Sequence, residues 1–268
     1  MAKLSKFIDT SVCTACRGCQ TACKNWNELP ATDTTFTGSY QTMADTDHQT
    51  YTVVTMKERY HGDFKYDWFF RKHGCMHCEE AACIKACPEG AVSKTESGAV
   101  IKDSDKCIGC GYCSHYCPFN IPKIDKATDQ MKKCILCFDR VGNGMLPACA
   151  KTCPPKAISF GEREALVEAA KARLDEVKEQ YPNANLYGLD DQFLGGTNVF
   201  YLLLEEPEFY DLSANPKVPA TLGLWKDVIS PVGKILPLGA LGAVVAATFV
   251  TRVKGNSHDE KGGDKDGK

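Results

Sequence analysis

Cysteines are the residues of this sequence whose type and spacing most clearly suggest chemistry. The chain has 268 residues and sixteen cysteines, which is far more than packing requires, and all sixteen fall into four groups of four. The groups are Cys13, Cys16, Cys19 and Cys23; Cys75, Cys78, Cys83 and Cys87; Cys107, Cys110, Cys113 and Cys117; and Cys134, Cys137, Cys149 and Cys153. The first and third groups have the Cys-x2-Cys-x2-Cys-x3-Cys spacing that holds cubane iron–sulfur clusters. We therefore predict four [4Fe–4S] clusters.

Two other uses of cysteine are open alternatives. Zinc also accepts four thiolates, but structural zinc sites usually join two separated Cys-x2-Cys knuckles, not several thiolates in one short loop. Disulfides fit an even number of cysteines in an oxidising compartment, yet closely spaced Cys-x2-Cys pairs are poor partners for structural crosslinks. The sequence also shows no secretory signal.

The fourth cysteine of each group is expected to bind the cluster of another group, as in two-cluster ferredoxins. Residues 91–94 and 99–102 look like a short hairpin between the second and third groups, so these two groups should exchange fourth ligands. By elimination, the first and fourth groups pair with each other. The predicted ligand sets are Cys75, Cys78, Cys83 and Cys117; Cys87, Cys107, Cys110 and Cys113; Cys13, Cys16, Cys19 and Cys153; and Cys23, Cys134, Cys137 and Cys149.

The net charge and the motifs that the sequence lacks argue against some classes of function. A formal net charge of -2 gives no basic footprint, so no nucleic-acid partner is expected. The chain has neither a nucleotide-binding glycine loop nor a catalytic triad signature, so we predict that it is not catalytic by itself. His73 and His77 flank Cys75 and are interpreted as surface or hydrogen-bonding histidines. Seven basic residues lie beside the cysteines, where they either tune the reduction potentials of the clusters or are solvated surface groups: Arg17, Lys24, Lys85, Lys106, Lys132, Lys133 and Lys151.

We predict that an α+β fold positions the cysteines. It consists of two ferredoxin-like two-cluster units related by pseudo-symmetry. Residues 1–29 and 124–160 form the outer unit, and residues 75–123 form the inner unit. Residues 30–74 are an insertion over the clusters with strand-like pieces at 51–56 and 68–70, and residues 161–228 are a C-terminal globular extension. Residues 162–180 predict an amphipathic surface helix, with these apolar residues at helical intervals: Leu166, Ala169, Ala170, Leu174 and Val177.

The end of the chain predicts one transmembrane helix over residues 230–253, followed by a disordered tail over 254–268. Residues 232–251 carry a single charge, Lys234, and Ser230 with Pro231 suits a helix start. A buried core helix is the alternative. Five basic residues follow the helix and three precede it, which favours a globular domain on the periplasmic side; a domain that faces the cytoplasm is the other possibility.

Residues outside the cysteine pattern resemble one family. The run from Cys13 to Pro30, the run Gly-Gly-Thr-Asn-Val-Phe-Tyr-Leu at 195–202 and Leu-Trp-Lys at 224–226 resemble the iron–sulfur (beta) subunit of membrane-bound formate dehydrogenases. This resemblance covers residues 5 to about 253. The four-cluster arrangement itself is shared with other electron-transfer subunits of molybdopterin oxidoreductases.

The resemblance implies a non-catalytic electron relay. The electrons would come from a catalytic (alpha) subunit with a molybdenum or tungsten bis-pterin site. They would pass to a membrane cytochrome b or another quinone-reacting subunit. The implied location is the inner (cytoplasmic) membrane, with a single-pass helix in the lipid and export in company with a twin-arginine partner. The alternatives are the four-cluster subunit of a membrane-bound nickel–iron hydrogenase or of another molybdopterin oxidoreductase, and a zinc-stabilised assembly scaffold.

Overall fold

The computed structural model describes residues 3–36, 38–190 and 193–223. The chain divides into two compact units, residues 1–219 and 220–268. Of the second unit, the described part is the short helix α7 (Ala220–Gly223). The sheets and cysteines discussed below all belong to the first unit.

A four-stranded sheet joins segments from both ends of the first unit. Its strand order is β8 (Ile158–Glu162), β1 (Leu4–Asp9), β10 (Val199–Leu203) and β9 (Asn185–Tyr187). Strand β1 runs parallel to β10 and antiparallel to β8, and β9 pairs with β10 in the antiparallel sense. The strand nearest the N-terminus therefore lies inside the sheet, where both of its edges are paired.

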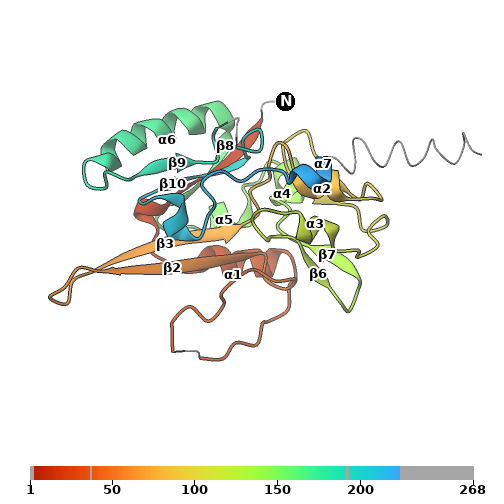
Figure 1. Cartoon of the computed structure of the whole chain (residues 1–268), viewed down its shortest axis with the longest axis horizontal. Coiled ribbons are helices and arrows are strands. Elements are labelled where there is room, and N and C mark those ends of the chain that lie inside the picture. The colour runs from red at the N-terminus through yellow and green to blue at the C-terminus, as the bar shows by residue number, and fades with distance from the viewer. Residues whose placement is uncertain (1–2, 37, 191–192, 224–268) are drawn as a thin grey trace, which may run out of the picture. The chain divides into compact units, whose positions relative to one another are not determined.

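Helix α6 (Arg163–Lys178) lies along one face of this sheet (Figure 1). Arg173 at its middle forms an ion pair with Asp9 of β1 at 3.1 Å, so the Asp9 side of β1 faces α6. Because side chains alternate along a strand, Lys6 and Ile8 point to the opposite face. The helix predicted over residues 162–180 is confirmed, although Ala169 is exposed and its neighbour Val167 packs against the core instead.

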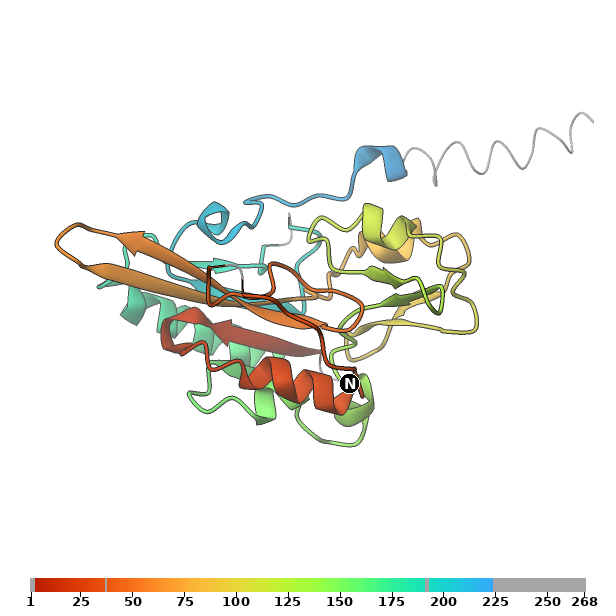
Figure 2. The same cartoon turned by 90° about the horizontal axis from the view of Figure 1, so that it is seen from below.

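Strands β2 (Thr52–Tyr60) and β3 (Tyr66–Gly74) form a separate antiparallel hairpin. Figures 1 and 2 show it as a long ribbon whose tip extends beyond the neighbouring elements. The predicted strands at 51–56 and 68–70 are confirmed within it. The base of the hairpin leads directly into Cys75, while the preceding helices η1 (Thr10–Val12) and α1 (Gly18–Trp26) carry the chain through the first cysteine group.

Short elements surround the second and third cysteine groups. The predicted hairpin between these groups is confirmed as β4 (Val92–Lys94) and β5 (Val100–Lys102), which pair antiparallel. A second small hairpin and two short helices complete this region: β6 (Lys123–Asp125), β7 (Gln130–Lys132), α2 (Ala82–Ala86) and α3 (Tyr112–His115). Val92, Val100 and Met131 form their shared apolar core.

Two further helices accompany the last cysteine group. Helix α4 (Phe138–Gly142) follows Cys137, and α5 (Ala148–Lys151) contains Cys149. Helix α5 packs against α1, as α2 packs against α3. Within the part of the chain that the structure describes, none of the helices has the length and apolar character needed to cross a membrane. The predicted transmembrane helix over 230–253 and the tail over 254–268 lie outside the described residues.

Candidate iron–sulfur cluster sites

The sixteen cysteines all lie among the described residues, and none of them forms a disulfide. Three cavities are each lined by four cysteines, and each set of four is one that the spacing predicts. We name the quartets after one member: the Cys75 site (Cys75, Cys78, Cys83 and Cys117), the Cys107 site (Cys87, Cys107, Cys110 and Cys113) and the Cys134 site (Cys23, Cys134, Cys137 and Cys149). In each of them, one cysteine comes from a different group of the sequence.

The remaining quartet is the Cys13 site (Cys13, Cys16, Cys19 and Cys153). Burial raises the pKa of Cys13, and the nearby thiolates of Cys153 and Cys16 raise it further. Burial also raises the pKa of Cys19 to about 11, with contributions from Cys13 and Cys153. These interactions show that Cys153 lies beside the first cysteine group, although about 130 residues separate them in the sequence.

All four sites share one backbone feature. The residue two positions after the first cysteine of each group has a positive φ: Ala15 at 52°, His77 at 49°, Gly109 at 68° and Leu136 at 56°. This left-handed conformation is uncommon for residues other than glycine. In three of the four loops, the backbone N–H of this left-handed residue itself points back at the first sulfur. The Leu136 N–H donates to Sγ of Cys134 at 3.4 Å, and the backbone N–H groups of Ala15 and His77 bind Cys13 and Cys75 in the same way.

Gly109 shows how tightly such a loop is packed. A Cβ atom added there would lie 2.5 Å from the carbonyl oxygen of Asp129, in the turn between β6 and β7. Real Cβ contacts are not that short, so the site accepts only glycine without a shift of the backbone. The left-handed φ at Gly109 adds a second reason, because glycine adopts it without steric cost.

The donor set fits iron–sulfur clusters. Thiolates are the ligands of such clusters, and hydrogen bonds to the sulfurs are one of the levers by which a protein tunes them. Backbone N–H groups of Ala91 and Met131 donate to Sγ of Cys87 at 3.2 Å and Sγ of Cys107 at 3.5 Å, respectively. Among the described residues, no three His, Cys, Asp or Glu side chains are placed to share one metal ion. The quartets instead line the walls of cavities.

The sites follow one another in a row. Burial raises the pKa of Cys83 to about 12, and the thiolate of Cys113 in the Cys107 site contributes. The thiolate of Cys134 likewise contributes to the raised pKa of Cys75, and the thiolate of Cys149 contributes to that of Cys19. These three proximities give the order Cys107 site, Cys75 site, Cys134 site and Cys13 site.

The row opens to the surface at both ends. Cys110 of the Cys107 site and Cys16 of the Cys13 site are exposed, whereas every cysteine of the Cys134 site is buried. Two exposed apolar side chains, Ile108 and Tyr112, flank Cys110. Electron-transfer groups placed in this row would therefore meet a partner at either end and be insulated in between.

Three lysines are buried among the cysteines: Lys6, Lys72 and Lys133. Lys133 donates to the carbonyl oxygens of Val100 and, at 2.9 Å, Cys134. Of the seven basic residues that the sequence places beside the clusters, Lys133 alone is buried. Lys6 and Lys72 were not predicted. The signal that could have revealed them is a lysine inside an apolar strand, as in Leu-Ser-Lys-Phe-Ile at 4–8.

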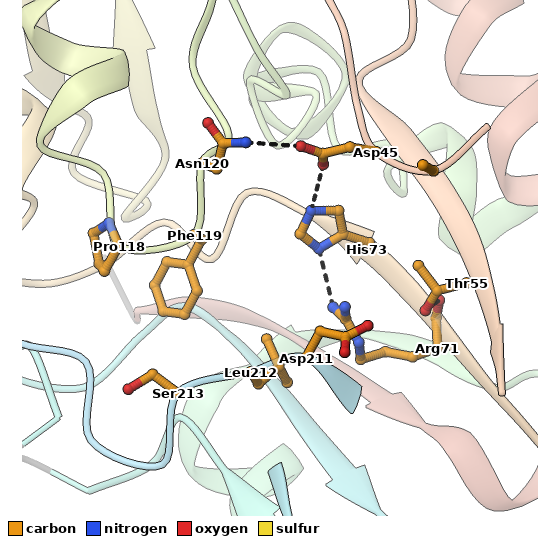
Figure 3. A pocket seen from close by; sticks show the side chains of 11 residues that line it. Asp45, Thr55, Arg71, His73, Pro118, Phe119, Asn120, Asp211, Leu212 and Ser213 are labelled. Carbon is orange, nitrogen blue, oxygen red and sulfur yellow. Dashed lines mark hydrogen bonds and ion pairs between the residues drawn. The ribbon is translucent and has the colours of Figure 1, made fainter. Parts of the chain in front are cut away.

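The two histidines beside Cys75 are hydrogen-bonding residues, as predicted. His77 is fully buried, and its Nδ1 accepts a hydrogen bond from the N–H of Val100 at 2.9 Å. His73 lies between two charged side chains, with Nε2 at 3.0 Å from Oδ1 of Asp45 and Nδ1 at 3.0 Å from Nη1 of Arg71 (Figure 3). Since a guanidinium can only donate, Nδ1 accepts and Nε2 carries the proton.

Asp45, Arg71 and His73 line the wall of a cavity of about 340 Å³ beside the Cys75 site. Asn120, two residues after Pro118, also lies there and donates to Oδ2 of Asp45 at 2.9 Å. Hydrogen bonds from His73 and Lys123 hold the pKa of the Asp45 carboxyl well below its usual range, although partial burial opposes this. The network ties the β2–β3 hairpin to the loop that follows Cys117.

Comparisons with known proteins agree with this geometry. Residues 66–163 match the family model described as a 4Fe-4S dicluster domain. The formate dehydrogenase iron-sulfur subunit of Haemophilus influenzae is 41% identical over 255 residues, which cover 93% of this chain and 80% of that protein. The nitrate-inducible formate dehydrogenase iron-sulfur subunit of Escherichia coli is 41% identical over 92% of this chain and 82% of its own length.

A shorter relative is similar over nearly its whole length. The formate dehydrogenase 2 subunit beta (cytochrome c-553) of Nitratidesulfovibrio vulgaris is 39% identical over 217 residues, which cover 76% of this chain and 94% of that protein. A ferredoxin-like 4Fe–4S fold of mixed helices and strands is thus common to the matched region and the structure. With sixteen cysteines in cluster-binding arrangement and about two-fifths identity over most of its length, the chain belongs to the family of formate dehydrogenase iron–sulfur subunits.

Proposed function

We propose that this chain is the electron-transfer subunit of a formate dehydrogenase complex and that its four quartets each hold one [4Fe–4S] cluster. The observation that carries the proposal is the arrangement of the four cysteine quartets in a row, with exposed cysteines only at its two ends. The names of the relatives add formate as the electron source. The ligand sets are those predicted from the spacing.

The residues of the chain hold and insulate the clusters. When bound, [4Fe–4S] groups supply one-electron transfer. The cysteines fix their positions, the left-handed residues aim N–H groups at the sulfurs, and the sheet keeps water from the Cys134 site. The two ferredoxin-like units are inferred to be related by pseudo-symmetry, because α1 packs against α5 as α2 packs against α3 and the same left-handed position recurs in each group.

Two exposed ends imply two redox partners. We assign one end to a catalytic subunit with a molybdenum or tungsten bis-pterin site, which would oxidise formate, and the other to a membrane cytochrome b or another quinone-reacting subunit. This division of labour leaves the chain itself non-catalytic. A row of clusters with one open end would need only one partner, so the exposure of both Cys16 and Cys110 supports a relay between two proteins.

Membrane attachment is a separate part of the proposal. The apolar composition of residues 230–253 supports a single-pass helix in the inner membrane, and the excess of basic residues after it supports a periplasmic globular domain. Protease treatment of intact spheroplasts should then degrade the cluster-binding part, whereas the same protein should resist protease in inside-out vesicles. The opposite pattern would place the domain in the cytoplasm.

The function is tested on the complex purified without oxygen from its native membrane. We expect at least sixteen iron and sixteen sulfide per copy of this chain, four of each for every cluster, in addition to the haem iron of a cytochrome b partner. We also expect molybdenum or tungsten in the large subunit, and clusters that become reduced and paramagnetic when formate is added. Nickel in place of molybdenum or tungsten would indicate a hydrogenase partner. About four zinc ions per chain with almost no iron would indicate an assembly scaffold.

A further inference from the structure

Lys6 and Lys72 come from two different sheets but line the same cavity as the four cysteines of the Cys134 site. Lys6 belongs to β1 and points away from α6; Lys72 belongs to β3, on the strand face opposite Arg71 and His73. Their side chains are almost inaccessible, since the residues expose 1% and 5% of their surface. Two ammonium groups thus share one closed site with four thiols.

Burying two like charges is costly unless an opposite charge lies close by. The effective penalty in proteins is several kcal/mol for each buried ion. Burial by itself lowers the pKa of Lys6, but the thiolates of Cys149 and Cys134 raise it above its ordinary value. The same thiolates raise the pKa of Lys72 against burial and against the charge of Lys6. The four cysteines that line the same cavity supply this opposite charge as thiolates, which allows both lysines to stay cationic.

The geometry places these charges beside any group held in the cavity. Lys6 and Lys72 line the same cavity as the four cysteines of the Cys134 site. Both residues are almost closed off from water, which screens buried charges much less than exposed ones. Their positive potential would stabilise any negative charge added to a group held there.

The Cys107 site is electrostatically different. Its cavity is lined by apolar residues, glycines and Glu89, with no lysine or arginine among the described lining residues. Lys102 lies close enough to Cys107 to feel its charge, but it is partly exposed to water. Solvent screens such charges far more than it screens buried ones. The row therefore has a buried site lined by two lysines in its inner part and, at one end, a site whose described lining contains no basic residue.

We propose that Lys6 and Lys72 are positioning residues that raise the reduction potential of the cluster at the Cys134 site above that of the cluster at the Cys107 site. This inference rests on the proposed function, since it presupposes clusters at both sites. A [4Fe–4S] group with four thiolates carries about two negative charges when oxidised and one more after reduction. Two fixed cations at its edge stabilise the added electron, so an electron would reside in the buried part of the row.

The test uses the purified complex with Lys6→Met and Lys72→Met variants. Methionine keeps most of the volume of the lysine stem but removes the charge. Iron and sulfide are counted first, and midpoint potentials are then measured by redox titration followed by electron paramagnetic resonance. The signal of the Cys134 site is identified as the one that changes in a Cys137→Ser variant, and the signal of the Cys107 site through Cys110→Ser.

With all four clusters present, each methionine variant should lower the midpoint potential of the Cys134 signal. The expected fall corresponds to at least a tenfold change in the reduced-to-oxidised ratio, or about 59 mV for one electron. A Lys6→Arg variant keeps the charge and should retain most of the potential. Lys178→Met, on the exposed end of α6, is the matched control and should change no signal.

Several results would overturn the inference. One is an unchanged Cys134 potential in variants with full iron content, and another is an equal fall of all four potentials, which would indicate a general structural effect. Should both methionine variants lose iron, the wild-type titration decides: the Cys134 signal must have a higher potential than the Cys107 signal. A wild-type complex without iron would instead refute the proposed function.

Discussion

At the scale of single residues, the position two after the first cysteine is where the backbone is most constrained. Four different residue types, alanine, histidine, glycine and leucine, adopt the left-handed conformation there. Outside glycine this conformation costs free energy, of the order of 1–3 kcal/mol per residue, and persists only where the surroundings enforce it. Its recurrence in all four groups therefore indicates that the four cysteine loops share one backbone requirement.

Gly109→Ala should disturb the Cys107 site selectively. The added methyl group collides with the carbonyl of Asp129, and we expect a loss of about 1–3 kcal/mol in stability together with loss of this one cluster. Iron content and the free energy of urea unfolding measure both effects. The control is Ala15→Gly at the corresponding position of the Cys13 site, which relieves strain and should keep all four clusters. A Gly109→Ala protein with full iron content and unchanged stability would contradict this reading.

Cys87→Ser tests whether fourth ligands cross between groups. Cys87 stands in the sequence with Cys75, Cys78 and Cys83, but it lines the cavity of the Cys107 site. The variant should therefore damage the cluster of the Cys107 site and leave that of the Cys75 site intact, as followed by the two magnetic resonance signals. Selective loss of the Cys75 signal would show that each group keeps its own fourth cysteine.

The sequence was informative where chemistry is local. Short spacings and the turn between two apolar runs predicted the β4–β5 hairpin and the quartets of the Cys75 and Cys107 sites. The quartet of the Cys134 site followed only by elimination, because Cys23 is far from Cys134 in the sequence. The apolar run at 4–8 is a sign that Lys6 is buried, but the sequence does not show that Lys6 and Lys72 face the same site, for a physical reason. Their burial depends on strands 4–9 and 66–74 facing one cavity, and β1 becomes a central strand only through pairing with residues 199–203. No local pattern records a contact at that separation.

At the scale of elements, the β2–β3 hairpin shares the main apolar core with the four-stranded sheet and is also joined to it by a buried charged contact. Arg59 of β2 forms an ion pair with Glu205, just after β10, at 2.6 Å. Its guanidinium also lies 5.3 Å from the ring centroid of Phe69 and 4.9 Å from that of Phe209. Glu205 is largely buried, so this contact is expected to matter more than the exposed ion pairs of the hairpin.

Arg59→Met should destabilise the protein by about 1–3 kcal/mol at pH 7, because it leaves the Glu205 carboxylate with fewer donors. The Arg59 hydrogen bond lowers the pKa of Glu205 in the folded protein, so the pair stabilises the fold above the ordinary glutamate pKa. The deficit of the variant should therefore shrink as the pH falls below about 4.3. Urea unfolding of the wild-type protein and of the variant across this pH range measures the difference in their free energies of unfolding.

Lys57→Met is the matched control on the same strand. Lys57 pairs with Asp211 at 2.6 Å, but the aspartate side chain is 71% exposed. Such pairs contribute little, so a change below about 1 kcal/mol is expected. Equal losses in the two variants would show that burial of Glu205 does not strengthen its pair.

At the scale of the whole molecule, all cluster ligands belong to the unit of residues 1–219. Deleting residues 230–268 should therefore leave cluster assembly intact and remove the proposed membrane anchor. We expect the shortened chain, produced without a membrane partner, to carry full iron and to remain in the supernatant after ultracentrifugation, whereas the full chain sediments with membranes. Loss of iron on shortening, or a shortened chain that still sediments with lipid, would contradict this.

The central place of β1 also has a consequence for how the protein is made. Its partner β10 ends at Leu203, so the sheet cannot close until nearly the entire first unit has left the ribosome. Until then β1 can pair only with β8, and the Lys6 wall of the Cys134 cavity is incomplete. A cluster assembled at that site during synthesis would be enclosed when the last strands arrive.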